Sequence, residues 1–114
     1  MRKLDGEQVL MRVFIGESDR WEHRPLHAAL LELFRREGLA GATVLRAVAG
    51  FGPDSVVHTA NILRLCSDLP LVIEVVDSQE HLDRVLPSVD RMMQGGLITM
   101  EKVRVRKYAQ GGES

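Results

Sequence analysis

The residues best suited to chemistry in this sequence lie in a long, glycine-bearing connection between two apolar runs. The runs at 42–49 and 69–76 enclose about nineteen residues, with Gly50 and Gly52 at the start. Connections in compact domains are usually only a few residues long, and longer ones are commonly binding loops or disordered segments. Glycines let the backbone approach a phosphate or a ribose because no Cβ is in the way, although they serve tight turns more often. His58 could contact a ligand there, or the threonine after it could cap a short helix.

Two alternating arginines near the end of the chain form a second feature with binding potential. Arg104 and Arg106 are two residues apart, so on a strand both side chains lie on the same face. Guanidinium groups bind phosphate through paired, parallel hydrogen bonds. The same alternation is common on the solvated face of an edge strand, where charge discourages pairing with other chains. Taken alone, the pattern favours this second explanation.

The histidines and the single cysteine give no complete catalytic or metal site. His23 and His27 have the spacing of a helical metal pair, but Pro25 between them marks a helix start and no third ligand is evident. Cys66 lacks an evident base and is interpreted as a buried structural thiol. The sequence contains no catalytic Ser, His and Asp order, no zinc spacing, and no Walker or dinucleotide motif. An enzyme is therefore not the leading interpretation.

The elements that would position these residues occur in two similar halves. Alternating apolar residues predict the strand that opens the first half, and a nearly continuous apolar run predicts the strand that opens the second. An apolar stripe at i, i+4, i+7 and i+8 predicts the first helix, and a similar stripe predicts the second. Asp77 and Glu80 have the spacing of a capping box and would open the second helix, and Pro87 inside it should cause a kink. The predicted elements are strand 8–15, helix 25–37, strand 42–49, strand 69–76, a helix that Gly95 and Gly96 end, and a strand from 97 to about 108.

Two βαβ units joined in this way predict an α+β fold of the ferredoxin-like βαββαβ type, with one antiparallel sheet and both helices on a single face. The other face would be bare. Leu10, Phe14 and Leu45 would lie on it and leave more apolar surface than soluble monomers usually expose. Self-association through the sheet is the simplest way to cover this apolar surface. The apolar positions of the last strand change parity after residue 100, which predicts a bulge near 101–102.

Composition narrows the classes of function. The chain has 114 residues, enough for a single domain over 1–114 with an ordered core at about 8–108. Its 15 basic and 16 acidic residues nearly cancel, which argues against a nucleic-acid surface. One cysteine excludes an internal disulfide. The start of the chain does not resemble a secretory signal, and no apolar run approaches the roughly 20 residues of a membrane span. We therefore expect a cytoplasmic protein without direct membrane insertion.

Four segments in order resemble a known family. GLAGATVLRAVAGFG, HTANILRL, SDLPLVIEVVD and GGLITMEKVRV are very similar to the uncharacterised bacterial family described as PII-like, over about residues 8–108. Through that family the chain is more distantly similar to the PII nitrogen-regulatory signalling proteins. The resemblance implies a homotrimer with its sheets facing inward and nucleotide sites in the clefts between subunits. It also implies that the loop 50–68 contacts a target protein, such as a membrane transporter, a channel or an enzyme.

The resemblance also implies which residues bind the effector, expected to be AMP, ADP, ATP or cyclic AMP. The expected set is Gly50, Phe51, Gly52, His58, Gly95, Gly96, Arg104 and Arg106. The first three match a GFG turn that approaches the nucleotide in PII proteins, and the arginines match a pair near the end of the last strand. The glycine pair stands where PII proteins have a longer phosphate-binding loop with an Asp and a Lys. This departure weakens the case for a triphosphate, although two successive glycine N–H groups can form a small anion nest.

A second class of function uses the same trimeric scaffold. The chain is also similar in plan to the divalent-cation tolerance proteins, in which case His23, His27 or His58 would bind metal. A small-molecule enzyme using the same cleft is a third and weaker alternative. The regulatory hypothesis requires glycines and arginines to converge. The metal hypothesis requires at least three ligand atoms within metal distance.

Overall fold

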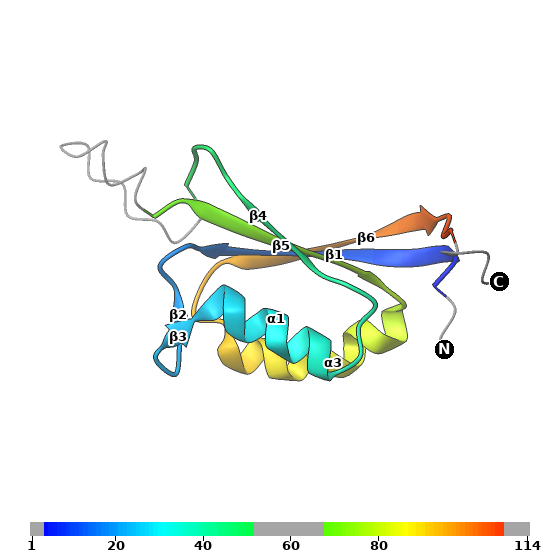
Figure 1. Ribbon diagram of the computed structural model, residues 1–114, viewed down its shortest axis with the longest axis horizontal. Helices are drawn as coiled ribbons and strands as arrows, with labels where there is room; N and C mark the ends of the chain where they lie inside the picture. The colour runs from blue at the N-terminus through cyan, green and yellow to red at the C-terminus, as the bar shows by residue number, and fades with distance from the viewer. Residues whose placement is uncertain (1–3, 52–67, 109–114) are drawn as a thin grey trace.

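The computed structural model describes residues 4–51 and 68–108, and these residues pack around one hydrophobic core. Gly52, His58 and Cys66 lie outside the described residues. Figure 1 shows an antiparallel sheet above two helices. The elements in chain order are β1 Gly6–Gly16, β2 Arg20–Trp21, β3 Arg24–Pro25, α1 Leu26–Arg36, β4 Thr43–Arg46, β5 Pro70–Asp77, α3 Gln79–Met92 and β6 Leu97–Val105.

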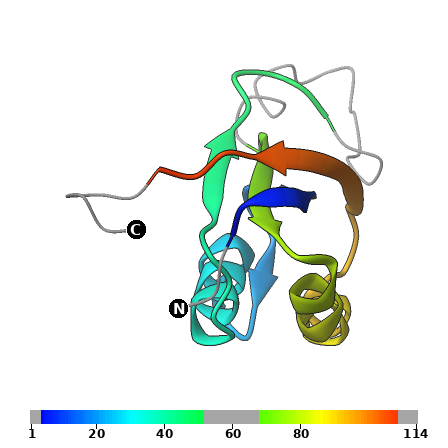
Figure 2. The same ribbon diagram turned by 90° about the vertical axis from the view of Figure 1, so that its right-hand side faces the viewer.

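The larger sheet has the strand order β4-β5-β1-β6, and every neighbouring pair is antiparallel. Both helices lie on the same side of this sheet (Figure 2). The arrangement is the ferredoxin-like α+β fold predicted from the sequence. The opposite face of the sheet, which we call the open face, is not covered by any described element.

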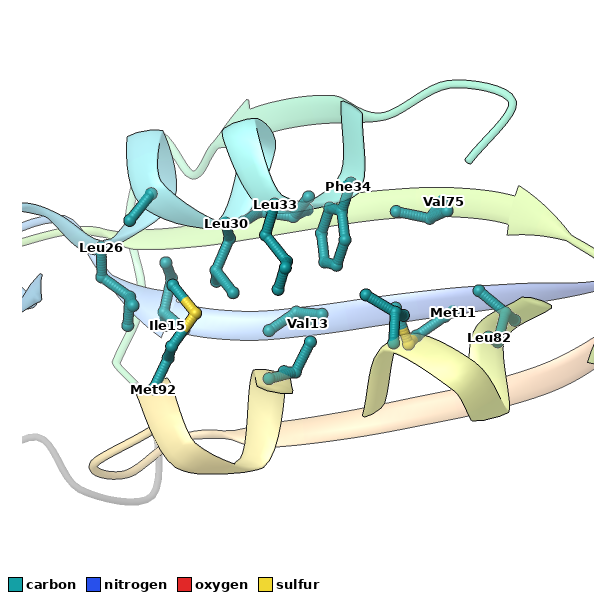
Figure 3. Close-up of a cluster of buried hydrophobic side chains, with 14 of the residues drawn as sticks. Met11, Val13, Ile15, Leu26, Leu30, Leu33, Phe34, Val75, Leu82 and Met92 are labelled. Atoms are coloured by element: carbon teal, nitrogen blue, oxygen red, sulfur yellow. The ribbon is translucent and has the colours of Figure 1, made fainter. Parts of the chain in front are cut away.

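The core forms because β1 and β5 alternate apolar residues with a period of two. Val9, Met11, Val13 and Ile15 are all buried on the helix side, and alternate residues of β5 join them. The two helices contribute apolar stripes that pack against this layer (Figure 3). Burying one such side chain contributes about 1.5–3 kcal/mol to the free energy of unfolding, so the helix-facing half of the sheet is the main source of stability.

The start of α3 differs from the prediction by one residue. Ser78, and not Asp77, is the capping residue, since its hydroxyl accepts a hydrogen bond from the backbone N–H of His81 at 3.2 Å. Asp77 is instead completely buried at the end of β5. Its carboxylate accepts hydrogen bonds from the backbone N–H of Ala40 at 2.9 Å and of Ser78 at 2.7 Å. Asp77 thereby ties the connection after α1 to the end of β5.

The bulge predicted in the last strand is wrong. β6 pairs with β1 in one continuous register, from Leu97 opposite Phe14 to Val105 opposite Gly6. The parity changes because the apolar residues change faces: Ile98 and Met100 are on the helix side, whereas Val103 and Val105 are on the open face. β5 ends opposite Val9, and beyond that point β1 and β6 continue past the helices as a ribbon of paired strands (Figure 1). Apolar residues on the helix side of this ribbon would have nothing to pack against.

A small hairpin between β1 and α1 was not predicted. Strands β2 and β3 pair Trp21 with Arg24. The two residues between them, Glu22 and His23, have φ values of 48° and 68°. Consecutive positive φ values favour Asn-Gly in such turns, so the usual sequence signal for a hairpin is missing here. The Arg20 side chain donates a hydrogen bond to the carbonyl oxygen of His23 at 2.7 Å and braces the turn.

Candidate functional site

The predicted glycine turn lies at the end of the sheet where β4 stops, to the left in Figure 1. Gly50 has φ +144°, a backbone conformation that residues with a side chain rarely adopt. A Cβ at this position would lie 3.6 Å from Cγ of Pro70, which is ordinary contact. The backbone angle, and not lack of space, therefore requires glycine. Phe51 follows with 69% of its surface exposed, so a large apolar side chain is available beside the turn.

Hydrogen bonds fix the base of the connection to the body of the protein. Ala47 donates its backbone N–H to the carbonyl oxygen of Pro70 at 2.9 Å, and Glu17 donates to that of Leu69 at 2.9 Å. The Asp68 carboxylate accepts from the backbone N–H of Ser18 at 3.0 Å. The two points at which residues 50–68 leave and rejoin the sheet are thus held in place by β1 and β5.

The glycines after α3 lie at the same end of the sheet, at its β6 edge. Gly96 has φ +82°, and a Cβ there would be 2.1 Å from the carbonyl oxygen of Phe14. This close approach to β1 is sufficient reason for glycine, independent of any ligand. Gly95 is half-buried beside it. Because Phe14 pairs with Leu97, and Gly16 with Pro70, both glycine turns border the same end of the sheet on different strands.

The predicted arginines lie at the end of the sheet opposite to the glycine turns. Arg104 is exposed and pairs across the ribbon with Glu7, and the guanidinium of Arg106 lies 5.7 Å from the centre of the Tyr108 ring. Leu97 and Arg104 are seven residues apart on a strand, which corresponds to about 23 Å. The structure therefore brings the glycine turns to one end and keeps the arginines together at the other. Within one chain the two groups do not converge.

One basic side chain at the glycine end was not singled out from the sequence. Arg46 is the last residue of β4 and forms an ion pair with Glu17. Its position at a strand end shortly before Gly50 was the available signal. Because both side chains are near the surface, the pair contributes little to stability, and its arginine is accessible to a ligand.

The open face combines apolar rows with a charged centre. Arg12 donates from Nε to Glu74 at 2.9 Å and from Nη1 to Glu101 at 2.7 Å, which joins β1, β5 and β6. The hydrogen bond to Glu74, and next the one to Glu101, raise the pKa of the Arg12 guanidinium above its ordinary value. Leu45 and Leu97 remain 46% and 41% exposed on this face. It is therefore a largely apolar surface, as predicted, but one with a fixed polar feature.

Other parts of the described structure show fewer features of a binding site. A hollow of about 330 Å³ lies between the second half of α1 and residues 39–42, and none of the predicted site residues lines it. Among residues 4–51 and 68–108, no three His, Cys, Asp or Glu side chains gather in a group that could hold a metal ion. His23 lies in the hairpin turn and His27 in the first turn of α1. No helix in the same ranges is long and apolar enough to cross a membrane.

Comparison with known proteins assigns the family. The model of DUF190, described as an uncharacterised ACR, matches residues 8–105. The chain belongs to the DUF190 family. A UPF0166 protein of Aquifex aeolicus is 38% identical over 99 residues, which cover 87% of this chain and 93% of the relative. A UPF0166 protein of Methanocaldococcus jannaschii is 32% identical over 99 residues, covering 86% and 91%.

Solved structures show the same fold as this DUF190 protein. The PII-like protein CPII of Thiomonas intermedia K12, bound to ADP, AMP and bicarbonate, matches with a TM-score of 0.60 at 11% identity, covering 88% of this chain and 96% of that one. A putative PII-like signalling protein of Thermus thermophilus matches with a TM-score of 0.60 at 20% identity, covering 88% and 90%. At these identities the likeness establishes a PII-like fold, in agreement with the resemblance noted in the sequence.

Proposed function

We propose that this DUF190 protein is a cytoplasmic, PII-like regulatory homotrimer that binds an adenine nucleotide in clefts between its subunits. In this proposal residues 50–68 pass the ligand state to a target protein, such as a transporter, a channel or an enzyme. The observation that carries the proposal is the placement of the predicted glycines and arginines at opposite ends of one sheet. A PII-like relative of the same fold that binds ADP and AMP supports the choice of ligand.

The distance between the predicted glycines and the predicted arginines argues for a site shared between copies of the chain. A hydrogen bond spans about 3 Å between heavy atoms, so one phosphate cannot contact both ends of a sheet whose ends are about 23 Å apart. If both predicted groups bind the same ligand, the glycine end of one copy must meet the arginine end of another. Cyclic assemblies bring different surfaces of neighbouring subunits together in this way.

The open face supports assembly. Its apolar residues extend from Leu45 and Leu97 at one end to Val103 and Val105 at the other, although no described element covers them. A patch of this kind on a soluble protein usually marks an interaction surface. The anchored base at Ala47 and Asp68 suits a signalling role for the connection, because movement there would be transmitted to residues that contact the sheet.

We propose a binding function without catalysis, with AMP, ADP, ATP or cyclic AMP as candidate effectors. The proposed contacts at the arginine end are made by Arg104 and Arg106, whose geometry suits phosphate. The ion-handling alternative has no supporting observation among the described residues, because they contain no group of three possible ligands.

Calorimetric titration of the four nucleotides tests this proposal. Arg104→Ala and Arg106→Ala should each weaken binding by about 1.5–3 kcal/mol, the range for a charge-assisted hydrogen bond. Lys102→Ala is the matched control, since Lys102 is an exposed cation on the same strand and contacts Glu7 at 3.9 Å. Failure of all four nucleotides to bind the wild type below millimolar concentration would refute the nucleotide assignment. Binding that ignores both arginines would place the site elsewhere.

A further inference from the structure

A row of polar residues crosses the open face, and its charges restrict which partner can cover the face. The strand register places four residues side by side across the sheet: Thr43, Glu74, Arg12 and Thr99. The neighbouring row consists of Leu45, Val72, Phe14 and Leu97. On the other side lie Val76, Leu10 and Glu101. Arg12 and Glu74 are thus on the two central strands of an otherwise apolar surface, and Glu101 is on the edge strand β6.

The charged residues are already ordered within one chain. Arg12 uses Nε and Nη1 to bind Glu74 and Glu101, and its Nη2 group makes no hydrogen bond to another described residue. Each carboxylate oxygen can accept more than one hydrogen bond. The row therefore presents both spare donors and spare acceptors outward, in a geometry fixed by two hydrogen bonds.

A second copy of this chain suits the face better than a membrane or an entirely apolar partner. Either of those would leave three charged groups desolvated without new hydrogen bonds, at a cost of several kcal/mol per ion. In a cyclic assembly every copy brings the same row, so the guanidinium of each copy can donate to the carboxylates of a neighbouring copy. The row is self-complementary, and only certain relative positions of two copies satisfy it.

The charges of the row and of Glu101, which lies beside the row on β6, do not balance. Each copy contributes one guanidinium against two carboxylates. The register places the nearby cations Arg46, Lys102 and Arg104 on the helix side of their strands, so the paired strand residues of the open face include no further positive charge. Covering the face would leave one carboxylate per copy without a counter-charge. A buried carboxylate in this position becomes neutral by taking up a proton.

We infer that copies of this chain associate through the open face in a register set by the Arg12 row, and that the association takes up protons on the Glu74 and Glu101 carboxyl pair. This inference rests on the assembly in the proposed function and adds its dependence on pH. The proton comes from solvent when the copies meet, because a carboxylate that is covered without a counter-charge becomes neutral. Association is therefore strongest at low pH and weakens as the pH rises.

Sedimentation equilibrium of the full chain at constant ionic strength between pH 5.5 and 8 tests this inference. The association constant of the wild type should fall with rising pH, by up to about tenfold per pH unit for each proton taken up. Glu101→Gln should associate more tightly than the wild type at pH 8 and show a smaller slope. Glu7→Gln is the matched control, because it removes the same charge from β1 on the helix side of the ribbon. It should keep the wild-type slope.

The titratable groups in this part of the face are Arg12 on β1, Glu74 on β5 and Glu101 on β6. The remaining strand, β4, contributes only Thr43 and Leu45. Any contribution from the histidines is the same in the wild type and in the variants, because none of them is changed. A wild-type association that does not depend on pH, or an equal slope in Glu101→Gln, Glu74→Gln and wild type, overturns the inference. A monomer at every pH does so as well.

The outcome can be separated from that of the proposed function. If nucleotides bind to an assembly whose stability ignores pH, the regulatory proposal stands and the proton-linked row is wrong. If the association shows the predicted slope and Glu101→Gln reduces it, but no nucleotide binds, the row is confirmed and the ligand assignment fails. Circular dichroism melting curves establish that each variant is folded before it is compared.

Discussion

The glycine turn after α3 allows a quantitative test of the structure, because three glycines differ in what a side chain would meet. A Cβ on Gly96 would be 2.1 Å from the carbonyl oxygen of Phe14, and φ there is +82°. Gly38 has nearly the same φ, +77°, but nothing lies within 4 Å of its Cβ position. Gly41 has neither the positive φ nor a neighbour within 4 Å. Alanine at these positions therefore separates backbone strain from steric overlap.

The expected magnitudes follow from these contacts. Left-handed backbone costs a residue with a Cβ roughly 1–2 kcal/mol, which is the expected loss for Gly38→Ala. Gly96→Ala adds an overlap with backbone that is relieved only by moving β1 or the turn, about 1–3 kcal/mol more. Its total loss should be about 2–5 kcal/mol. Gly41→Ala should change the free energy of unfolding by no more than about 0.5 kcal/mol, as exposed substitutions usually do.

Urea denaturation followed by circular dichroism measures all three changes under the same conditions. From the most to the least stable, the expected order of the variants is Gly41→Ala, Gly38→Ala and Gly96→Ala. If Gly96→Ala were no less stable than Gly38→Ala, Phe14 would not be in the way and the packing of this turn against β1 would be wrong. The same result would leave the positive φ as the structural reason for a glycine at 96.

Two further predictions concern assembly and the buried carboxylate. Leu45→Asp places a charge on the exposed part of the open face and should dissociate the proposed trimer in light scattering while the chain stays folded, whereas Val13→Asp should unfold the chain because Val13 is fully buried under the helices. A trimer that forms and survives Leu45→Asp would contradict the assignment of this face. Asp77→Ala leaves the backbone N–H groups of Ala40 and Ser78 without their acceptor and should cost about 2–4 kcal/mol in urea denaturation, with a loss below 1 kcal/mol arguing against both hydrogen bonds.

Much of the fold could be predicted because burial leaves a direct trace in the sequence. Residues of β1 such as Met11 and Val13 alternate with half-exposed neighbours, and that alternation marks both the strand and its buried face. The phase of β6 was misread because a change of buried face and a bulge produce the same pattern of apolar residues. The pairing partner decides between them, and the sequence of one strand does not contain it.

The candidate site was predicted less completely. Glycine records a backbone requirement but not its cause, so the overlap with Phe14 at Gly96 is indistinguishable in sequence from a phosphate contact. The hairpin at Glu22 and His23 was missed because residues other than glycine occupy its positive φ positions. The resemblance named Arg104 together with the glycines, but a distance of about 23 Å along a strand becomes visible only when the register is known.

The central claim is that the ligand lies between copies, and a mixing experiment tests it directly. One variant carries Gly50→Val, which disables the glycine end, and a second carries Arg104→Ala with Arg106→Ala. Each is first shown to be folded, trimeric and unable to bind ADP in calorimetric titration. The two are then mixed under conditions that allow subunits to exchange.

In the proposed arrangement, mixed trimers contain clefts formed by the intact arginine end of one variant and the intact glycine end of the other. We predict that mixing restores ADP binding in a fraction of the clefts, with the affinity of the wild type. If exchange is complete and no binding returns, the two ends do not form one site between copies, and the account given for this protein is contradicted.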